Sequence, residues 1–136
     1  MTLVFRPKMF ALTILGGKKM LKLKDIHNLA MNEVGNHLSK QGFEFLAVNS
    51  QLNKDPQFVC LKNKKLHFIV VRGYLYPDNP MKFNIQLMDQ VREHGIKYKA
   101  NTYYAGVGFA NAQDYELPLT KNDSYVGNFD GLQIMD

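Results

Sequence analysis

Thr102–Ala110 reads T-Y-Y-A-G-V-G-F-A, and this run decides the fold of the 136-residue chain. It is apolar on both alternating sets of positions and carries small residues at Ala105, Gly106 and Gly108. Strands that are covered on both faces read in this way, because neither face meets water. We therefore expect a central strand here, with the other elements arranged around it.

A helix and a second long strand are expected just before this run. Pro77-Asp78-Asn79-Pro80 breaks the chain, and Asn79 is the predicted helix N-cap with Pro80 as the first helical residue. The helix then ends near His94-Gly95. Leu66–Tyr76 precedes the break as an extended run. Because a helix connects the two strands, we expect a right-handed crossover that makes them parallel neighbours.

Three more elements are expected further upstream. Gln57–Lys62 and Leu66–Tyr76 are joined by a short polar connection that is typical of a hairpin, and Gly73 predicts a bulge or bend in the longer strand. Phe43–Val48 is predicted as a first strand. Asp25–Lys40 has apolar residues at steps of three and four, which predicts a helix.

The region after Asn111 gives weaker signals, with candidate strands at Tyr115–Leu119 and Tyr125–Ile134. The predicted class is therefore α+β with a mixed sheet. Its order is a helix, a three-stranded antiparallel meander, a crossover helix, a parallel strand and a C-terminal extension.

Length and charge indicate one domain over residues 20–136. The formal net charge is +5, but four basic residues and no acidic ones precede Met20, which leaves 13 basic and 12 acidic residues from there on. Residues 1–19 are expected to be a leader, either a mis-assigned start or disordered, with an extra strand or a targeting segment as alternatives. The domain itself is nearly neutral.

Cysteine and histidine use argues against several kinds of site. Cys60 is the only cysteine, so one chain can form no disulfide and no four-cysteine cage, and a reducing cytoplasm is the expected location. No apolar run is long enough to span a membrane. The histidines have no metal-ligand spacing, so no metal site is expected.

The element order over residues 25 to 110 resembles the core of the PD-(D/E)xK nuclease superfamily, which has the restriction-endonuclease-like fold. The resemblance implies an Asp at the start of the second core strand and an acidic-x-Lys triplet on the third, which together hold a divalent metal. Asp55 occupies the first position, and Val70-Val71-Arg72 stands in place of the triplet, with valine where the carboxylate is required. Glu33 on the first helix is a further candidate carboxylate. The expected centre is therefore degenerate, with Glu33, Asp55 and Arg72 as catalytic candidates.

Two other groups of residues are candidate binding sites. The basic residues around the hairpin form a candidate nucleic-acid strip or, alternatively, a solvated turn that discourages aggregation. They are Lys54, Lys62, Lys64, Lys65 and Arg72. The polar exit of the central strand is a candidate small-molecule pocket, because open α/β sheets often bind ligands at the carboxyl ends of their strands. Its candidates are Asn111, Asp114 and Glu116.

The stretches Asn49–Leu52, Pro56–Cys60 and Tyr104–Gly108 resemble those of short stand-alone bacterial proteins that are labelled as a component of the sodium-translocating NADH-quinone reductase. That label implies an iron–sulfur cluster, FAD and NADH sites and a membrane anchor. With one cysteine, no nucleotide fingerprint and no spanning helix, no cofactor residue carries over, and no cofactor is expected.

Three functional hypotheses follow. The first is a non-enzymatic cytoplasmic domain of degenerate nuclease-like fold that binds an unknown protein partner or acts as a scaffold. The second is nucleic-acid binding or weak metal-dependent nuclease activity. The third is an accessory role beside an NADH-quinone reductase, implied by the resemblance alone. The oligomeric state is not predicted.

Overall fold

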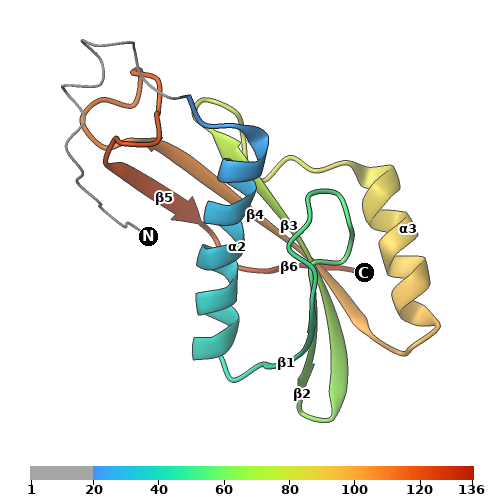
Figure 1. Ribbon diagram of the computed structural model, residues 1–136. Coiled ribbons are helices and arrows are strands. Elements are labelled where there is room, and N and C mark those ends of the chain that lie inside the picture. Colours follow the sequence, from blue (N-terminus) through green and yellow to red (C-terminus); the bar gives the residue numbers. More distant parts are fainter. Residues whose placement is uncertain (1–19) are drawn as a thin grey trace.

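The computed structural model describes residues 20–136, which form two helices and a six-stranded mixed sheet (Figure 1). Predictions for residues 1–19 lie outside the described residues. The elements are α2 (Leu23–Lys40), β1 (Glu44–Val48), β2 (Phe58–Lys62), β3 (Lys65–Leu75), α3 (Ile85–Ile96), β4 (Asn101–Asn111), β5 (Tyr125–Phe129) and β6 (Gln133–Met135). The predicted α+β class is confirmed.

The strand pairing also follows the expected order. β1, β2 and β3 pair antiparallel as a meander, and β3 pairs parallel with β4 after the α3 crossover. The far edge of β4 is shared by two short antiparallel strands, β5 opposite Val107–Asn111 and β6 opposite Thr102–Tyr104. β4 is thus an interior strand along most of its length.

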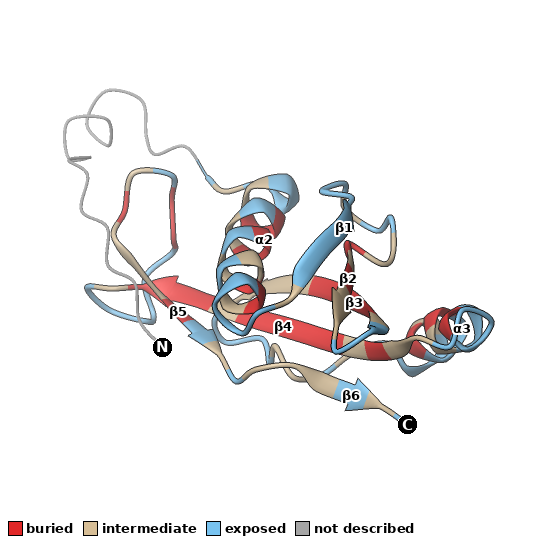
Figure 2. Cartoon of the chain, turned by 90° about the horizontal axis from the view of Figure 1, so that it is seen from below, coloured by how far each residue is buried: buried red, intermediate tan, exposed pale blue. Residues whose placement is uncertain are grey.

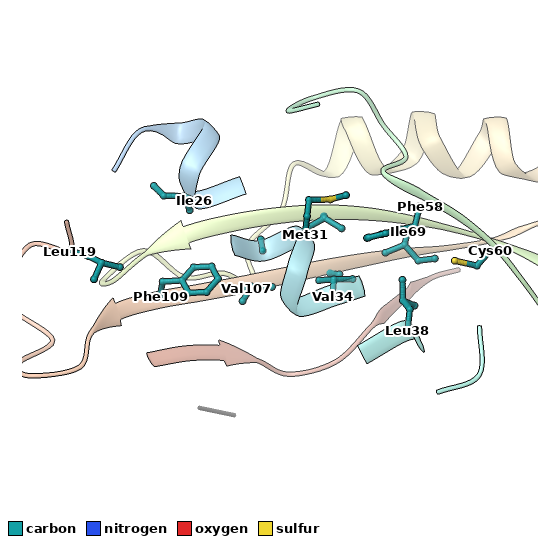
Figure 3. Packing of buried hydrophobic residues seen from close by; sticks show 13 residues of the cluster. Ile26, Met31, Val34, Leu38, Phe58, Cys60, Ile69, Val107, Phe109 and Leu119 are labelled. Carbon is teal, nitrogen blue, oxygen red and sulfur yellow. The ribbon is translucent and has the colours of Figure 1, made fainter. Parts of the chain in front are cut away.

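Each helix covers one face of the sheet. On one face, apolar side chains of α2 such as Val34 and Leu38 pack on Ile69 and Val107 (Figure 3). On the other face, Met88 and Val91 of α3 pack with Phe68, Val70 and Tyr104. The burial map shows β4 red along most of its length (Figure 2), which confirms the strand predicted to be covered on both sides.

Gly73 does not mark a bulge, which corrects the prediction from the sequence. The pairing of β3 with β4 runs through Gly73 without a shift in register. A Cβ at this position would lie 2.8 Å from the Ile26 carbonyl oxygen and 3.1 Å from the Ala30 Cβ. The glycine therefore allows α2 to approach the sheet closely, and the register shift lies in β1, between Phe45 and Ala47.

The predicted start of α3 is also wrong. The helix begins at Ile85, and its N-cap is Asn84, whose side chain accepts a hydrogen bond from the Leu87 backbone N–H at 3.0 Å. Asn79 instead accepts from the backbone N–H of Met81, within a turn. The Pro80 carbonyl of that turn accepts a hydrogen bond from the Tyr104 hydroxyl at 2.7 Å. This tertiary bond holds the Asn79-Pro80 segment in a loop on the sheet.

Replacing Asn84 by alanine should lower the free energy of unfolding by about 1 kcal/mol, because the substitution removes the N-cap hydrogen bond. Chemical denaturation of the two proteins measures the difference. Asn79→Ala is the matched control, and it should cost less than half as much because no helix begins there. An equal loss from both variants would contradict the assignment of Asn84 as the cap.

The C-terminal region corrects two expectations. Tyr115–Leu119 forms no strand: Pro118 lacks an N–H, its carbonyl accepts from the Asn111 side chain, and the Asp114 carboxylate accepts from the Glu116 N–H. The predicted strand Tyr125–Ile134 is divided into β5 and β6. Gly131 lies between them with a φ of 95°, a left-handed conformation that interrupts an extended chain.

Candidate functional site

Asp55 and Arg72, two of the three catalytic candidates, form a bidentate ion pair. Arg72 Nη1 donates to Asp55 Oδ1 and Nη2 donates to Oδ2, both at 2.8 Å. The Asp55 side chain is 7% exposed and that of Arg72 is 16% exposed. Asp55 comes from the loop before β2 and Arg72 from the second half of β3, so the pair ties this loop to the sheet. Two parallel charge-assisted bonds fix both side chains in one geometry.

Gln57 completes this arrangement, although it is not among the residues predicted from the sequence. Its side chain is buried, and Nε2 donates to Asp55 Oδ1 at 2.8 Å and to the Lys54 carbonyl at 3.2 Å. Oε1 accepts from the Val71 backbone N–H at 2.7 Å. The β2–β3 pairing ends at Phe58 and Ile69, so the Gln57 amide satisfies a backbone donor of β3 that β2 does not reach. A lone glutamine before a strand carries no motif that predicts this role.

His27, on the first turn of α2, is the second residue beside the pair that no sequence motif predicts. It is 2% exposed, and within residues 20–136 neither ring nitrogen has a hydrogen-bond partner. Desolvation lowers its pKa, and the positive charge of nearby Arg72 acts in the same direction. His27 is therefore held neutral next to the ion pair.

The electrostatics of Asp55 combine opposing effects. Burial acts to raise its pKa, but the hydrogen bonds from Arg72 and Gln57 outweigh burial, and the pKa lies below its ordinary value. Asp55 therefore stays a carboxylate at neutral pH. Its negative charge is matched by Arg72 at direct contact.

These residues do not fit a divalent metal. Both Asp55 oxygens accept from Arg72, and Val70 is fully buried against the α3 face, so no second carboxylate lies on β3 at the position that the nuclease-like motif requires. Glu33 does not contact the pair: its Oε1 lies 3.9 Å from where a Cβ on Gly127 of β5 would be. No group of three His, Cys, Asp or Glu side chains suited to a metal ion occurs in residues 20–136.

The candidate nucleic-acid residues separate into two places. Lys62, Lys64 and Lys65 lie at the tip of the β2–β3 hairpin. Lys54 lies in the loop at the other end of β2, and the Arg72 guanidinium is engaged by Asp55. The structure therefore groups three of the five residues and separates the other two from them.

The candidate pocket residues surround a cavity at the carboxyl end of β4 without forming its walls. The cavity measures about 360 Å³, and its lining includes Tyr76, Asp78, Tyr115 and Asn128. Asn111 is buried and holds the loop through the Pro118 carbonyl. Glu116 lies beside the Tyr76 phenol, where its carboxylate raises the Tyr76 pKa, and the adjacent Asp114 acts in the same direction.

Comparison with other proteins places the chain in a family. No helix in residues 20–136 is both long and apolar enough to cross a membrane. No curated protein and no solved structure matches the sequence. A family model does match, over residues 24–135, from the first turn of α2 to the last residue of β6. The chain belongs to this family, the domain of unknown function DUF8840.

Proposed function

We propose that the chain is a non-catalytic protein-binding domain, a scaffold built on a degenerate restriction-endonuclease-like fold. The element order from α2 to β4 supports this likeness, because a meander, a crossover helix and a parallel strand follow the first helix. The Asp55–Arg72 pair supports a non-catalytic role, because the carboxylate that a nuclease would use for metal is neutralised by an internal cation. The single buried thiol of Cys60, whose pKa burial raises to about 11, suits work in the cytoplasm.

The observation that carries the binding role is the exposed edge strand β1. It lies at one end of the strand order, and all five of its residues are exposed (Figure 2). Leu46 is 50% exposed and Val48 56%. Edge strands are normally protected by lysine, proline or a covering segment, because their free backbone groups can pair with another chain. β1 contains neither lysine nor proline, and within residues 20–136 no strand pairs with its outer edge.

A groove between α2 and β1 extends this surface. It has a volume of about 540 Å³, and its lining has no charged side chain: Asn28, Met31, Asn32, Gly35, Asn36, Val48, Ser50 and Phe58. The three asparagines follow one another at steps of four along α2, so they share a face of the helix. Amide side chains can both donate to and accept from an extended backbone. The groove therefore suits an uncharged, partly apolar segment of a partner protein that adds a strand to β1.

Site-specific crosslinking in the native cell tests this role. A photoreactive p-benzoylphenylalanine at position 46 should give one discrete adduct with another protein, and none should form from position 23, because Leu23 is exposed but lies at the start of α2. A second substitution, Val48→Lys, should reduce the adduct at least fivefold, because a charge on an edge strand opposes strand addition. Circular dichroism checks that both variants are folded.

Three outcomes would overturn the proposal. An adduct of twice the chain's mass would identify a second copy as the occupant. Equal labelling from positions 46 and 23 would show no selective surface. Cleavage of DNA or RNA by the purified chain with Mg²⁺ or Mn²⁺, lost in Asp55→Asn, would favour the metal-dependent nuclease instead.

A further inference from the structure

Five lysines from two separate turns meet at one end of the sheet, a region that we call the basic end. They are Lys62, Lys64 and Lys65 of the β2–β3 hairpin and Lys97 and Lys99 of the α3–β4 loop. β3 and β4 are parallel with His67 opposite Asn101, so Lys65 and Lys99, each two residues earlier, enter neighbouring strands at the same level. Both turns lie at the lower end of the molecule in Figure 1.

The clustering makes the domain electrically asymmetric. From Met20 onward the chain has 13 basic and 12 acidic residues, so without these five lysines it would have eight basic against 12 acidic. Neither turn contains an acidic residue. The two ion pairs found in the described part of the chain, Asp55–Arg72 and Asp25–Lys121, involve none of the five. A near-neutral domain therefore presents one cationic end.

The two turns are fixed in shape. Asn63 and Lys64 have φ angles of 53° and 64°, the pair of left-handed conformations that a two-residue hairpin turn requires. Lys99 has a φ of 57° in the second turn. Edge protection does not account for these lysines, because β2, β3 and β4 are interior strands.

An exposed aromatic side chain lies among the cations. Tyr98 stands between Lys97 and Lys99 and is 56% exposed. Its ring contacts His94, with ring centroids 5.3 Å apart, and approaches Phe68 at 6.1 Å, so one side of the phenol is supported while the rest faces solvent. On the hairpin side, Lys62 Nζ lies 4.8 Å from the centroid of the Phe43 ring.

We propose that the basic end binds single-stranded nucleic acid, with lysines of both turns on successive phosphates and Tyr98 stacked on a base. Cationic side chains that follow a backbone, together with a solvent-facing aromatic ring, are the two elements of sequence-independent single-strand recognition. This inference goes beyond the proposed protein-binding role, because β1 and its groove take no part in it. The two surfaces would let a scaffold hold a protein and a nucleic acid at once.

Fluorescence anisotropy with a labelled oligothymidylate of about 15 nucleotides tests the proposal. With three to five phosphate contacts, binding should weaken about 20- to 100-fold between 50 and 200 mM salt. Lys64→Glu/Lys65→Glu and Lys97→Glu/Lys99→Glu should each weaken binding at least tenfold and flatten the salt dependence. Tyr98→Ala should weaken binding about tenfold and leave the salt dependence unchanged, because stacking releases no counterions.

Lys24→Glu/Lys82→Glu is the matched control, since it changes the net charge equally but lies away from the basic end, and it should alter binding by less than about twofold. Leu46→Lys should also leave binding unchanged, which separates this proposal from the protein-binding role. No saturable binding, or an equal loss in the control, would overturn the proposal. Tighter binding to a duplex or to phosphatidylserine vesicles than to the oligothymidylate would identify a different ligand. Circular dichroism establishes that each variant is folded.

Discussion

Replacing Asp55 by alanine should lower the free energy of unfolding by about 3 to 5 kcal/mol, because it leaves the Arg72 guanidinium buried without its anion. The substitution also removes one acceptor of Gln57, whose amide bridges the loop and the Val71 backbone. Urea denaturation followed by circular dichroism measures the loss.

Two further variants separate the pair from a general effect of charge. Asp55→Ala/Arg72→Met should recover much of the lost stability, since an apolar side chain replaces the unpaired cation. Asp89→Ala, at an exposed position on α3, should change the free energy of unfolding by less than about 0.5 kcal/mol. A loss at Asp55 as small as that at Asp89 would show that the ion pair does not stabilise the fold.

The pH dependence of stability should distinguish Asp55 from His27. The pKa of each is lower in the folded chain than in the unfolded chain, so the unfolded chain binds more protons and acid destabilises the fold in both cases. The contribution of His27 should be lost as the pH falls below about 6.5, and that of Asp55 as it falls below about 3.8. In the Asp55→Ala/Arg72→Met variant, only the second loss should disappear.

The second large effect is expected at Gly106, where Gly106→Ala should lower the free energy of unfolding by about 3 kcal/mol or more. A Cβ at this position would overlap the Pro80 carbonyl oxygen and lie 2.7 Å from the Tyr104 hydroxyl oxygen. Those two atoms form the hydrogen bond that fixes the loop before α3 to the sheet. The new methyl group must therefore displace backbone, which a flexible side chain cannot relieve.

Gly108→Ala is the matched control, because Gly108 lies two residues along β4 on the same face. There a Cβ would meet the Pro80 ring at 3.1 Å, a contact that a small shift can relieve, and the cost should stay within about 1 kcal/mol. Thermal and urea unfolding of both variants provide the comparison. Similar stability of the two would mean that the loop does not press on Gly106.

The sequence predicts the elements of this fold where periodicity is strong. The helix over Asp25–Lys40 and the strand over Thr102–Ala110 lie within α2 and β4, because each repeats an apolar pattern over many residues. The start of α3 is missed because Asn79-Pro80 has the local chemistry of a helix start, and a hydrogen bond from distant Tyr104 overrides it. The tail is missed because a left-handed Gly131 has no signature in hydrophobic periodicity.

The candidate site is predictable only in part, for a similar reason. Asp55 and Arg72 stand out from a motif, but that they bind each other depends on how the loop folds back over β3. Gln57 and His27 belong to no motif, and their roles arise from burial beside the pair. Lys97 and Lys99 escape a search for charge runs near the hairpin, since only the parallel pairing of β3 and β4 brings the two turns together.

The antiparallel pairing of β6 with β4 also decides where attachments to this chain would lie. Met135 is opposite Thr102, so Asp136 and the main-chain carboxylate that follows it lie next to the α3–β4 turn. A purification tag, a dye or a surface tether joined after Asp136 therefore begins beside Lys99. An acidic tag there would compete with phosphate for the lysines, whereas a dye there would report directly on occupancy.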